Sequence, residues 1–166
     1  MTMLSVGAKA PDFTLSGIDG KQYALSAALK QGPLLAVFIQ TACPICDLVM
    51  PYLNRLAATY GGQGCQLWAI SEDGQEASRR YAQRFGASFP LLVDDPADGW
   101  IVSHAYDPSV TPTLFLIGPD GRVQLSGEGF SKADLNAVGE RIASHLGVQP
   151  AVVAERNDGN PDLRPG

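Results

Sequence analysis

The feature that most constrains the fold is an uninterrupted apolar run, Leu34–Ile39, that lies just before a helical pattern. An apolar run without polar alternation is typical of a strand that is buried on both faces of a sheet. Apolar residues at three- and four-residue spacing then run from Cys46 to Tyr60, which predicts an amphipathic helix that ends at Gly61. A buried strand that leads directly into a helix predicts an α/β fold.

The rest of the chain predicts a mixed sheet between helices. Two short strands flank an Asp19-Gly20 turn, which is a strong hairpin signal near the amino terminus. Further strands are expected over residues 67–70, 89–93, 113–117 and 122–125, and further helices over residues 75–85, 100–106 and 131–146. Alternating strands and helices predict parallel pairs, whereas the turn at residues 118–121 requires an antiparallel pair. We therefore expect a three-layer α/β/α sandwich with a mixed central sheet and an N-terminal β-hairpin extension.

Size and composition predict one domain and restrict the partners. The 166 residues suit a single domain, which we place at residues 1–147, and the polar composition of residues 148–166 predicts a flexible C-terminal tail. The net charge of −5 argues against nucleic acid as a partner. No leader segment is recognisable, and the longest apolar stretch, residues 33–39, is too short for a membrane span. We expect a cytoplasmic protein with neither a nucleic-acid nor a membrane partner.

The three cysteines, at positions 43, 46 and 65, are too few for the disulfide framework of a secreted scaffold. Two of them form Cys43-Pro44-Ile45-Cys46, where the buried strand is followed by the helix. Unpaired N–H groups and the helix dipole at a helix amino terminus stabilise a thiolate over a thiol. Cys43 has that position, and Cys46 lies one turn further, where it can attack a mixed disulfide formed on Cys43. We therefore predict that both cysteines are catalytic.

Several segments between residues 7 and 146 resemble one family. They are Gly7–Phe13, the strand with its Cys-x-x-Cys pair, Met50–Leu53, and Val110–Ile117 with the following Asp120-Gly121. On these segments the chain resembles the thioredoxin superfamily, and within it the TlpA/ResA-like and redoxin branch that is related to AhpC/TSA proteins.

The resemblance implies a thioredoxin-like fold and a thiol-disulfide oxidoreductase, an enzyme whose redox group is the Cys43–Cys46 disulfide and which uses no other cofactor or metal. It also implies a cis peptide bond before Pro112, beside the cysteines. In relatives the residue before that proline, here Thr111, offers its backbone to an extended substrate, and we expect Ala42 and Pro44 to border the same site. The substrate would be a protein or small-molecule disulfide or thiol, with an electron donor that is unidentified.

The chain departs from the family pattern around the second thiol. Val37 and Val49 stand where relatives carry the carboxylates that accept the proton of the second cysteine, and Ala42 replaces the usual aromatic residue. Glu72 and Asp73, at the end of the next strand, remain as candidate proton acceptors. A reducing cytoplasm would make disulfide reduction the working direction.

Two other functions stay open. A peroxiredoxin-like thiol peroxidase with antioxidant activity shares the Ala10–Phe13 opening, but its Pro-x-x-x-Thr-x-x-Cys pattern fits neither cysteine of the pair, although Thr41 lies close. A non-enzymatic module would use the two thiols to bind a soft metal such as Cu(I). A zinc site is not expected, because the remaining candidate ligands, Cys65, His104 and His145, supply no second close pair. Cys65 is interpreted as a core residue.

Overall fold

The computed structural model describes residues 3–166 and contains a seven-stranded mixed sheet in the order β2-β1-β5-β4-β3-β6-β7. The strands are β1 (Thr14–Gly17), β2 (Gln22–Ala24), β3 (Leu34–Ile39), β4 (Gln66–Ser71), β5 (Leu91–Val93), β6 (Thr113–Ile117) and β7 (Val123–Glu128). The neighbouring pairs β3–β4 and β4–β5 are parallel, whereas the pairs that involve β1, β6 or β7 are antiparallel. The structure therefore confirms the predicted mixed sheet.

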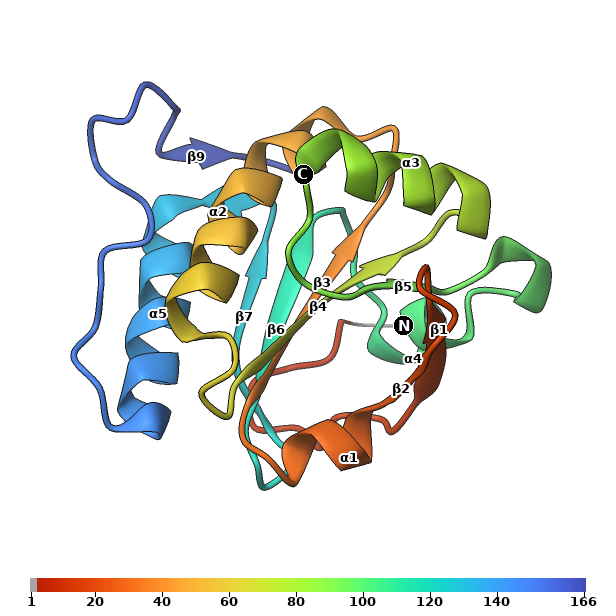
Figure 1. Cartoon of the computed structure of the whole chain (residues 1–166), viewed down its shortest axis with the longest axis horizontal. Coiled ribbons are helices and arrows are strands. Elements are labelled where there is room, and N and C mark those ends of the chain that lie inside the picture. The colour runs from red at the N-terminus through yellow and green to blue at the C-terminus, as the bar shows by residue number, and fades with distance from the viewer. Residues whose placement is uncertain (1–2) are drawn as a thin grey trace.

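Helices cover both faces of this sheet and form the outer layers (Figure 1). They are α1 (Leu25–Leu29), α2 (Pro44–Tyr60), α3 (Gln75–Phe85), α4 (Ile101–Tyr106) and α5 (Lys132–Leu146), with a 3₁₀ turn at Pro96–Asp98. Buried residues of α2, α3 and α5 pack on one face, and those of α1 and α4 pack on the other. The arrangement is the predicted three-layer α/β/α sandwich.

The central position of β3 in the sheet explains why its sequence shows no polar alternation. Side chains of successive strand residues point to opposite faces of a sheet. Leu35, Val37 and Ile39 accordingly belong to the core below α2, α3 and α5, whereas Leu34, Ala36 and Phe38 belong to the core below α1 and α4. All six side chains are at most 1% exposed, because both faces of the strand are covered.

The predicted amino-terminal hairpin is present and extends the main sheet. Strand β1 pairs with β2 across the Asp19-Gly20 turn, with Leu15 opposite Tyr23. The other edge of β1 pairs antiparallel with β5, through Ser16 and Val93. The hairpin therefore lengthens the sheet beyond its parallel part.

The segment of residues 148–166 differs from the expected mobile tail, because it packs on the rest of the molecule. Val153 and Ala154 are 2% and 3% exposed and belong to the core between α2 and α5. The segment ends in the short strand β9 (Leu163–Arg164), which pairs antiparallel with β8 (Phe130–Ser131). In Figure 1 this dark blue chain returns along the outside of α5 and α2. Polar composition suggested disorder, but two buried apolar residues and many hydrogen bonds hold the segment in place.

None of the helices within residues 3–166 is both long and apolar enough to cross a bilayer.

Candidate active site

The Cys-x-x-Cys pair lies where the sequence predicted it, at the start of α2 beyond the end of β3. Cys43 is the N-cap residue of α2, with an extended backbone, and Pro44 occupies the first helical turn, where its missing N–H costs nothing. The backbone N–H of Cys46 donates to Cys43 Sγ over 3.1 Å. A sulfur that caps a helix amino terminus receives the donors and the dipole that favour a thiolate.

The two thiols have different environments. Cys43 is partly exposed, whereas Cys46 is fully buried below the first turn of α2. Burial, with a further contribution from the hydrogen bond to Cys43, raises the pKa of the Cys46 thiol above its usual range. Burial therefore disfavours the thiolate form of Cys46, whereas Cys43 is the more accessible sulfur of the pair.

The loop before β6 lies against Cys43. The Thr111–Pro112 peptide bond is cis, as the resemblance implied. The Cys43 thiol donates to the Thr111 carbonyl oxygen over 3.5 Å, and Thr111 Oγ1 lies 3.7 Å from the same sulfur. Antiparallel pairing of β6 with β3, with Phe38 opposite Thr113, brings this loop to the end of β3 from which the cysteines follow.

The expected substrate-binding residues are not equally accessible. Ala42 and Pro44 are exposed and Thr111 is partly exposed, but Pro112 is buried. Of the four expected residues, Ala42 and Pro44 are therefore the most open to a substrate.

Glu72 and Asp73 lie beside the turn that precedes Cys43. Asp73 Oδ2 accepts hydrogen bonds from Thr41 N over 2.6 Å and from Thr41 Oγ1 over 2.8 Å. Glu72 Oε1 accepts from Gln40 Nε2 over 2.9 Å. Among the hydrogen bonds of residues 3–166, none joins either carboxylate to a thiol of the pair. Their observed contacts thus hold the loop that carries Cys43.

One carboxylate near the pair was not selected from the sequence. Asp47 follows Cys46 in the first turn of α2, where it accepts from Tyr81 Oη over 3.0 Å and forms an ion pair with Arg84 at 3.3 Å. Burial, and then the hydrogen bond to Asp47, raises the pKa of Tyr81. The sequence signal that could have identified Asp47 is an acidic residue in the first turn of a predicted helix. Its partners, Tyr81 and Arg84, lie on α3, more than thirty residues away in the chain.

The third cysteine and the histidines lie in other contexts. Cys65 lies immediately before β4 and is 7% exposed, and burial raises its pKa to about 12. His104 packs against Trp100, and His145 hydrogen-bonds with Gln124 over 2.8 Å. The part of the chain that the structure describes contains no group of three or more His, Cys, Asp or Glu side chains arranged to hold a metal ion.

The fold and the paired thiols define the class of protein: a thioredoxin-like thiol-disulfide oxidoreductase. The chain is similar to the thiol-disulfide oxidoreductase ResA of Geobacillus thermodenitrificans, with 35% identity over 124 residues that make up 74% of this chain and 69% of the relative. The model of the AhpC/TSA family matches residues 6–126, and the chain belongs to this family.

Solved structures place the fold in the same class. A putative thiol:disulfide interchange protein DsbE from Chlorobium tepidum matches with a TM-score of 0.76 and 30% identity, covering 86% of this chain and 99% of that protein. The peroxidoxin BcpB of Mycobacterium tuberculosis shares the fold, with a TM-score of 0.69, 22% identity, and coverage of 86% of this chain and 96% of that protein. The comparisons confirm the family, the fold and the enzyme class that the sequence predicted.

Proposed function

We propose that Cys43 is the attacking thiol, that Cys46 is the resolving thiol, and that the protein works as a disulfide reductase. This assignment rests on the different environments of the two thiols, which lie within one helical turn of each other. Cys43 is a partly exposed N-cap whose sulfur accepts the Cys46 N–H over 3.1 Å, whereas Cys46 is fully buried. Exposure and thiolate stabilisation make Cys43 the nucleophile.

In the proposed reaction the Cys43 thiolate attacks one sulfur of a substrate disulfide. A new disulfide forms between Cys43 and that sulfur, and the other substrate sulfur leaves as a thiolate. Cys46 then gives up its proton and attacks Cys43 Sγ, which closes the Cys43–Cys46 disulfide and releases the second substrate thiolate. Two electrons pass from the pair to the substrate, and a thiol donor outside this chain must return them. No cofactor beyond the redox-active disulfide takes part.

The substrate would lie along the exposed residues beside Cys43. Ala42 and Pro44 flank the sulfur, and the Thr111 backbone would pair with an extended substrate segment, as in relatives. Glu72 and Asp73 remain candidate acceptors for the Cys46 proton, and their observed contacts with Gln40 and Thr41 would require a bridging water for that role. The substrate is then a disulfide of a protein or a small molecule.

The working direction depends on the compartment. We place the protein in the cytoplasm, with no nucleic-acid or membrane partner, and a glutathione-buffered cytoplasm keeps such a pair reduced. The reduction potential of the Cys43–Cys46 couple, measured against glutathione or dithiothreitol, tests this direction. A potential as oxidising as those of periplasmic oxidants, about −120 mV, would instead support disulfide formation.

Insulin reduction with dithiothreitol as the donor tests the function and the role of each cysteine. We expect the unmodified protein to accelerate the reaction, and Cys43→Ser to return the rate to the uncatalysed background. Cys65→Ser is the matched control, since Cys65 is buried away from the pair, and it should keep full activity. Hydrogen peroxide replaces insulin in a parallel assay of the peroxidase alternative. Full insulin reduction by Cys43→Ser would contradict the assignment.

A further inference from the structure

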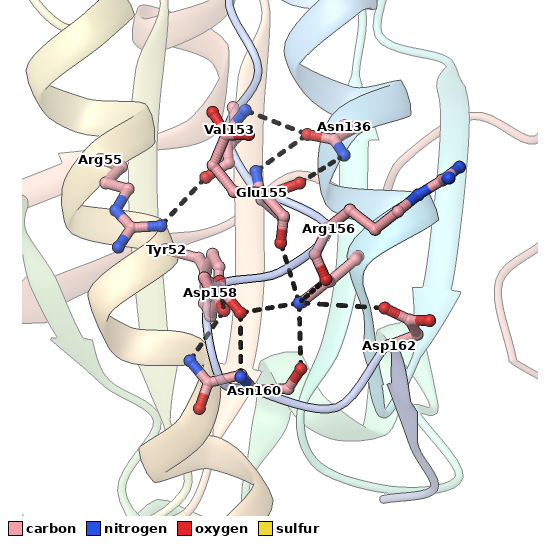
Figure 2. Close-up of polar contacts among 11 residues, drawn as sticks. Tyr52, Arg55, Asn136, Val153, Glu155, Arg156, Asp158, Asn160 and Asp162 are labelled. Atoms are coloured by element: carbon pink, nitrogen blue, oxygen red, sulfur yellow. Dashed lines mark hydrogen bonds and ion pairs between the residues drawn. The ribbon is translucent and has the colours of Figure 1, made fainter.

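A buried lysine at the start of α5 anchors the segment that follows this helix. The Lys132 side chain is 5% exposed. Its ammonium lies 2.7 Å from Asp158 Oδ1, 2.9 Å from the Glu155 carbonyl oxygen and 3.0 Å from the Asn160 carbonyl oxygen (Figure 2). A buried ammonium is stable only where oxygen atoms replace its water, and here residues 155–160 supply them. We call residues 148–166, the whole segment after α5, the C-terminal strap.

The strap is tied to α2 as well as to α5. Asp158 also accepts a hydrogen bond from the Tyr52 hydroxyl of α2, which in turn accepts from Asn160 Nδ2 over 2.9 Å. Asn136 of α5 accepts from the backbone N–H groups of Val153 and Ala154, over 3.0 Å and 2.9 Å, and Figure 2 shows these contacts side by side. Polar contacts from two helices therefore fix the path of the strap up to residue 160.

Beyond this anchor, the strap runs to the cis-proline loop. Strand β9 pairs with β8, with Leu163 opposite Ser131, and the residue before β8, Gly129, donates its N–H to the Pro112 carbonyl oxygen over 2.8 Å. A β-carbon placed on Gly166 would lie 2.8 Å from the Thr111 carbonyl oxygen. In Figure 1 the end of β9 points to the first turn of α2, where the cysteines lie.

The position of residues 163–166 matters because it borders the proposed substrate loop. The Thr111 carbonyl oxygen that Gly166 approaches is the same atom that accepts from the Cys43 thiol. Residues 163–166 are themselves exposed, and Leu163 is 62% exposed. They therefore add little to the core, and their main contacts are with β8 and with the loop at residues 110–111.

We propose that residues 163–166 form a cover over one side of the substrate loop and so determine which disulfides reach Cys43. This inference rests on the proposed function. A small disulfide reaches the sulfur past Ala42 and Pro44 without moving the cover. A disulfide within a protein needs the Thr111 backbone for an extended segment, and the cover competes for that position. The strap thus favours small or flexible disulfide substrates over folded proteins.

A variant that lacks residues 163–166 tests the cover, because it keeps the Lys132 anchor with Asp158 and Asn160 intact. We expect kcat/KM for insulin to rise by about tenfold, mainly through a lower KM, as about 1.4 kcal/mol of competing contact is removed. The kcat/KM for bis(2-hydroxyethyl) disulfide, a small disulfide, should stay unchanged. Val152→Ala, at another exposed apolar residue of the strap, is the matched control and should alter neither value.

A second variant keeps the test decisive if the shortened chain folds poorly. Asp158→Asn weakens the anchor without shortening the strap, and it should raise the ratio of insulin to small-disulfide kcat/KM in the same direction. An unchanged ratio in a correctly folded variant overturns the proposed cover, whether neither kcat/KM value changes or both rise equally. If the unmodified protein reduces neither disulfide, the proposed function itself fails, which is a different outcome from an unchanged ratio.

Discussion

At the scale of single residues, the two cysteines of α2 differ in what surrounds them although only two residues separate them. Cys43 caps the helix and touches the Thr111 carbonyl, whereas Cys46 lies among core side chains. Residues three apart lie on the same face of a helix, so the difference comes from depth: Cys43 caps the open end of α2, whereas Cys46 lies one turn further in. The same contrast was predicted from the position of the pair between an apolar run and an amphipathic pattern.

The proposed resolving role of Cys46 predicts a trapped intermediate. In Cys46→Ser the mixed disulfide on Cys43 cannot be resolved within the chain, so we expect a stable covalent adduct with insulin or a small disulfide. Intact-mass spectrometry under non-reducing conditions measures this adduct. Cys43→Ser provides the comparison and should form no adduct, since the remaining thiol of the pair is buried. An adduct on Cys46 in that variant would reverse the two roles.

At the scale of elements, α5 has two functions in this fold. The Ser131 hydroxyl caps its first turn by accepting from Asp134 N over 3.1 Å. Lys132, the first residue of the helix, anchors the strap. The hydrogen bond from Lys132, followed by that from Tyr52, lowers the pKa of Asp158 well below its usual value. The same contact with Asp158 raises the pKa of Lys132. Asp162, 3.8 Å from the ammonium, is the other charged group at this anchor.

These shifts predict that the strap detaches in acid. A carboxylate with a lowered pKa stabilises the folded state above the usual Asp value of about 4, and this contribution is lost as the pH falls through the folded-state value. Lys132, with a raised pKa, loses its contribution only above about pH 10.5. We expect lower protection factors for amide hydrogen exchange in residues 153–162 below about pH 4 than at neutral pH. Mass spectrometry of peptic fragments measures them.

Two comparisons separate detachment of the strap from unfolding of the whole chain. Amides of β3 should stay protected at a pH where the strap already exchanges, because both faces of this strand are buried. Asp158→Asn should give equal protection factors in the strap at neutral and at acidic pH. A strap that stays equally protected at pH 3 and pH 7 would contradict the electrostatic anchor.

At the scale of the whole molecule, the sheet separates two cores of different composition. The core below α2, α3 and α5 is mostly aliphatic, whereas the other contains an aromatic cluster in which Phe38, Tyr106 and Phe115 pack with ring centroids 5.4 to 5.8 Å apart. The candidate active site lies at one end of the first core, at the carboxyl end of β3, where open α/β sheets gather their ligands. The stability of the first core therefore supports the position of the cysteines.

Leu53→Ala tests how much this core contributes. Leu53 of α2 is fully buried, and its truncation should lower the free energy of unfolding by about 2–5 kcal/mol, measured by urea denaturation. Val152→Ala removes a side chain that is 64% exposed and should change the free energy by less than about 0.5 kcal/mol. Equal effects of the two substitutions would mean that α2 contributes little to the core.

The sequence by itself determined the elements whose signals are local. The apolar run of β3, the stripe of α2 and the Asp19-Gly20 turn each predicted an element that the structure contains, because periodicity and turn chemistry act over a few residues. The neighbour of Cys43, Thr111, lies 68 residues away and was expected only through a resemblance.

Only the tertiary structure decided the path of residues 148–166. Their composition is that of a disordered tail, and Lys132 looks like any surface lysine in the first turn of a helix. The Lys132 ammonium, the Tyr52 hydroxyl and the Asn136 amide hydrogen-bond to residues 154–158 and order the segment. No local sequence pattern encodes these contacts. Long-range polar contacts leave no periodic signal, since each depends on where two distant elements come together.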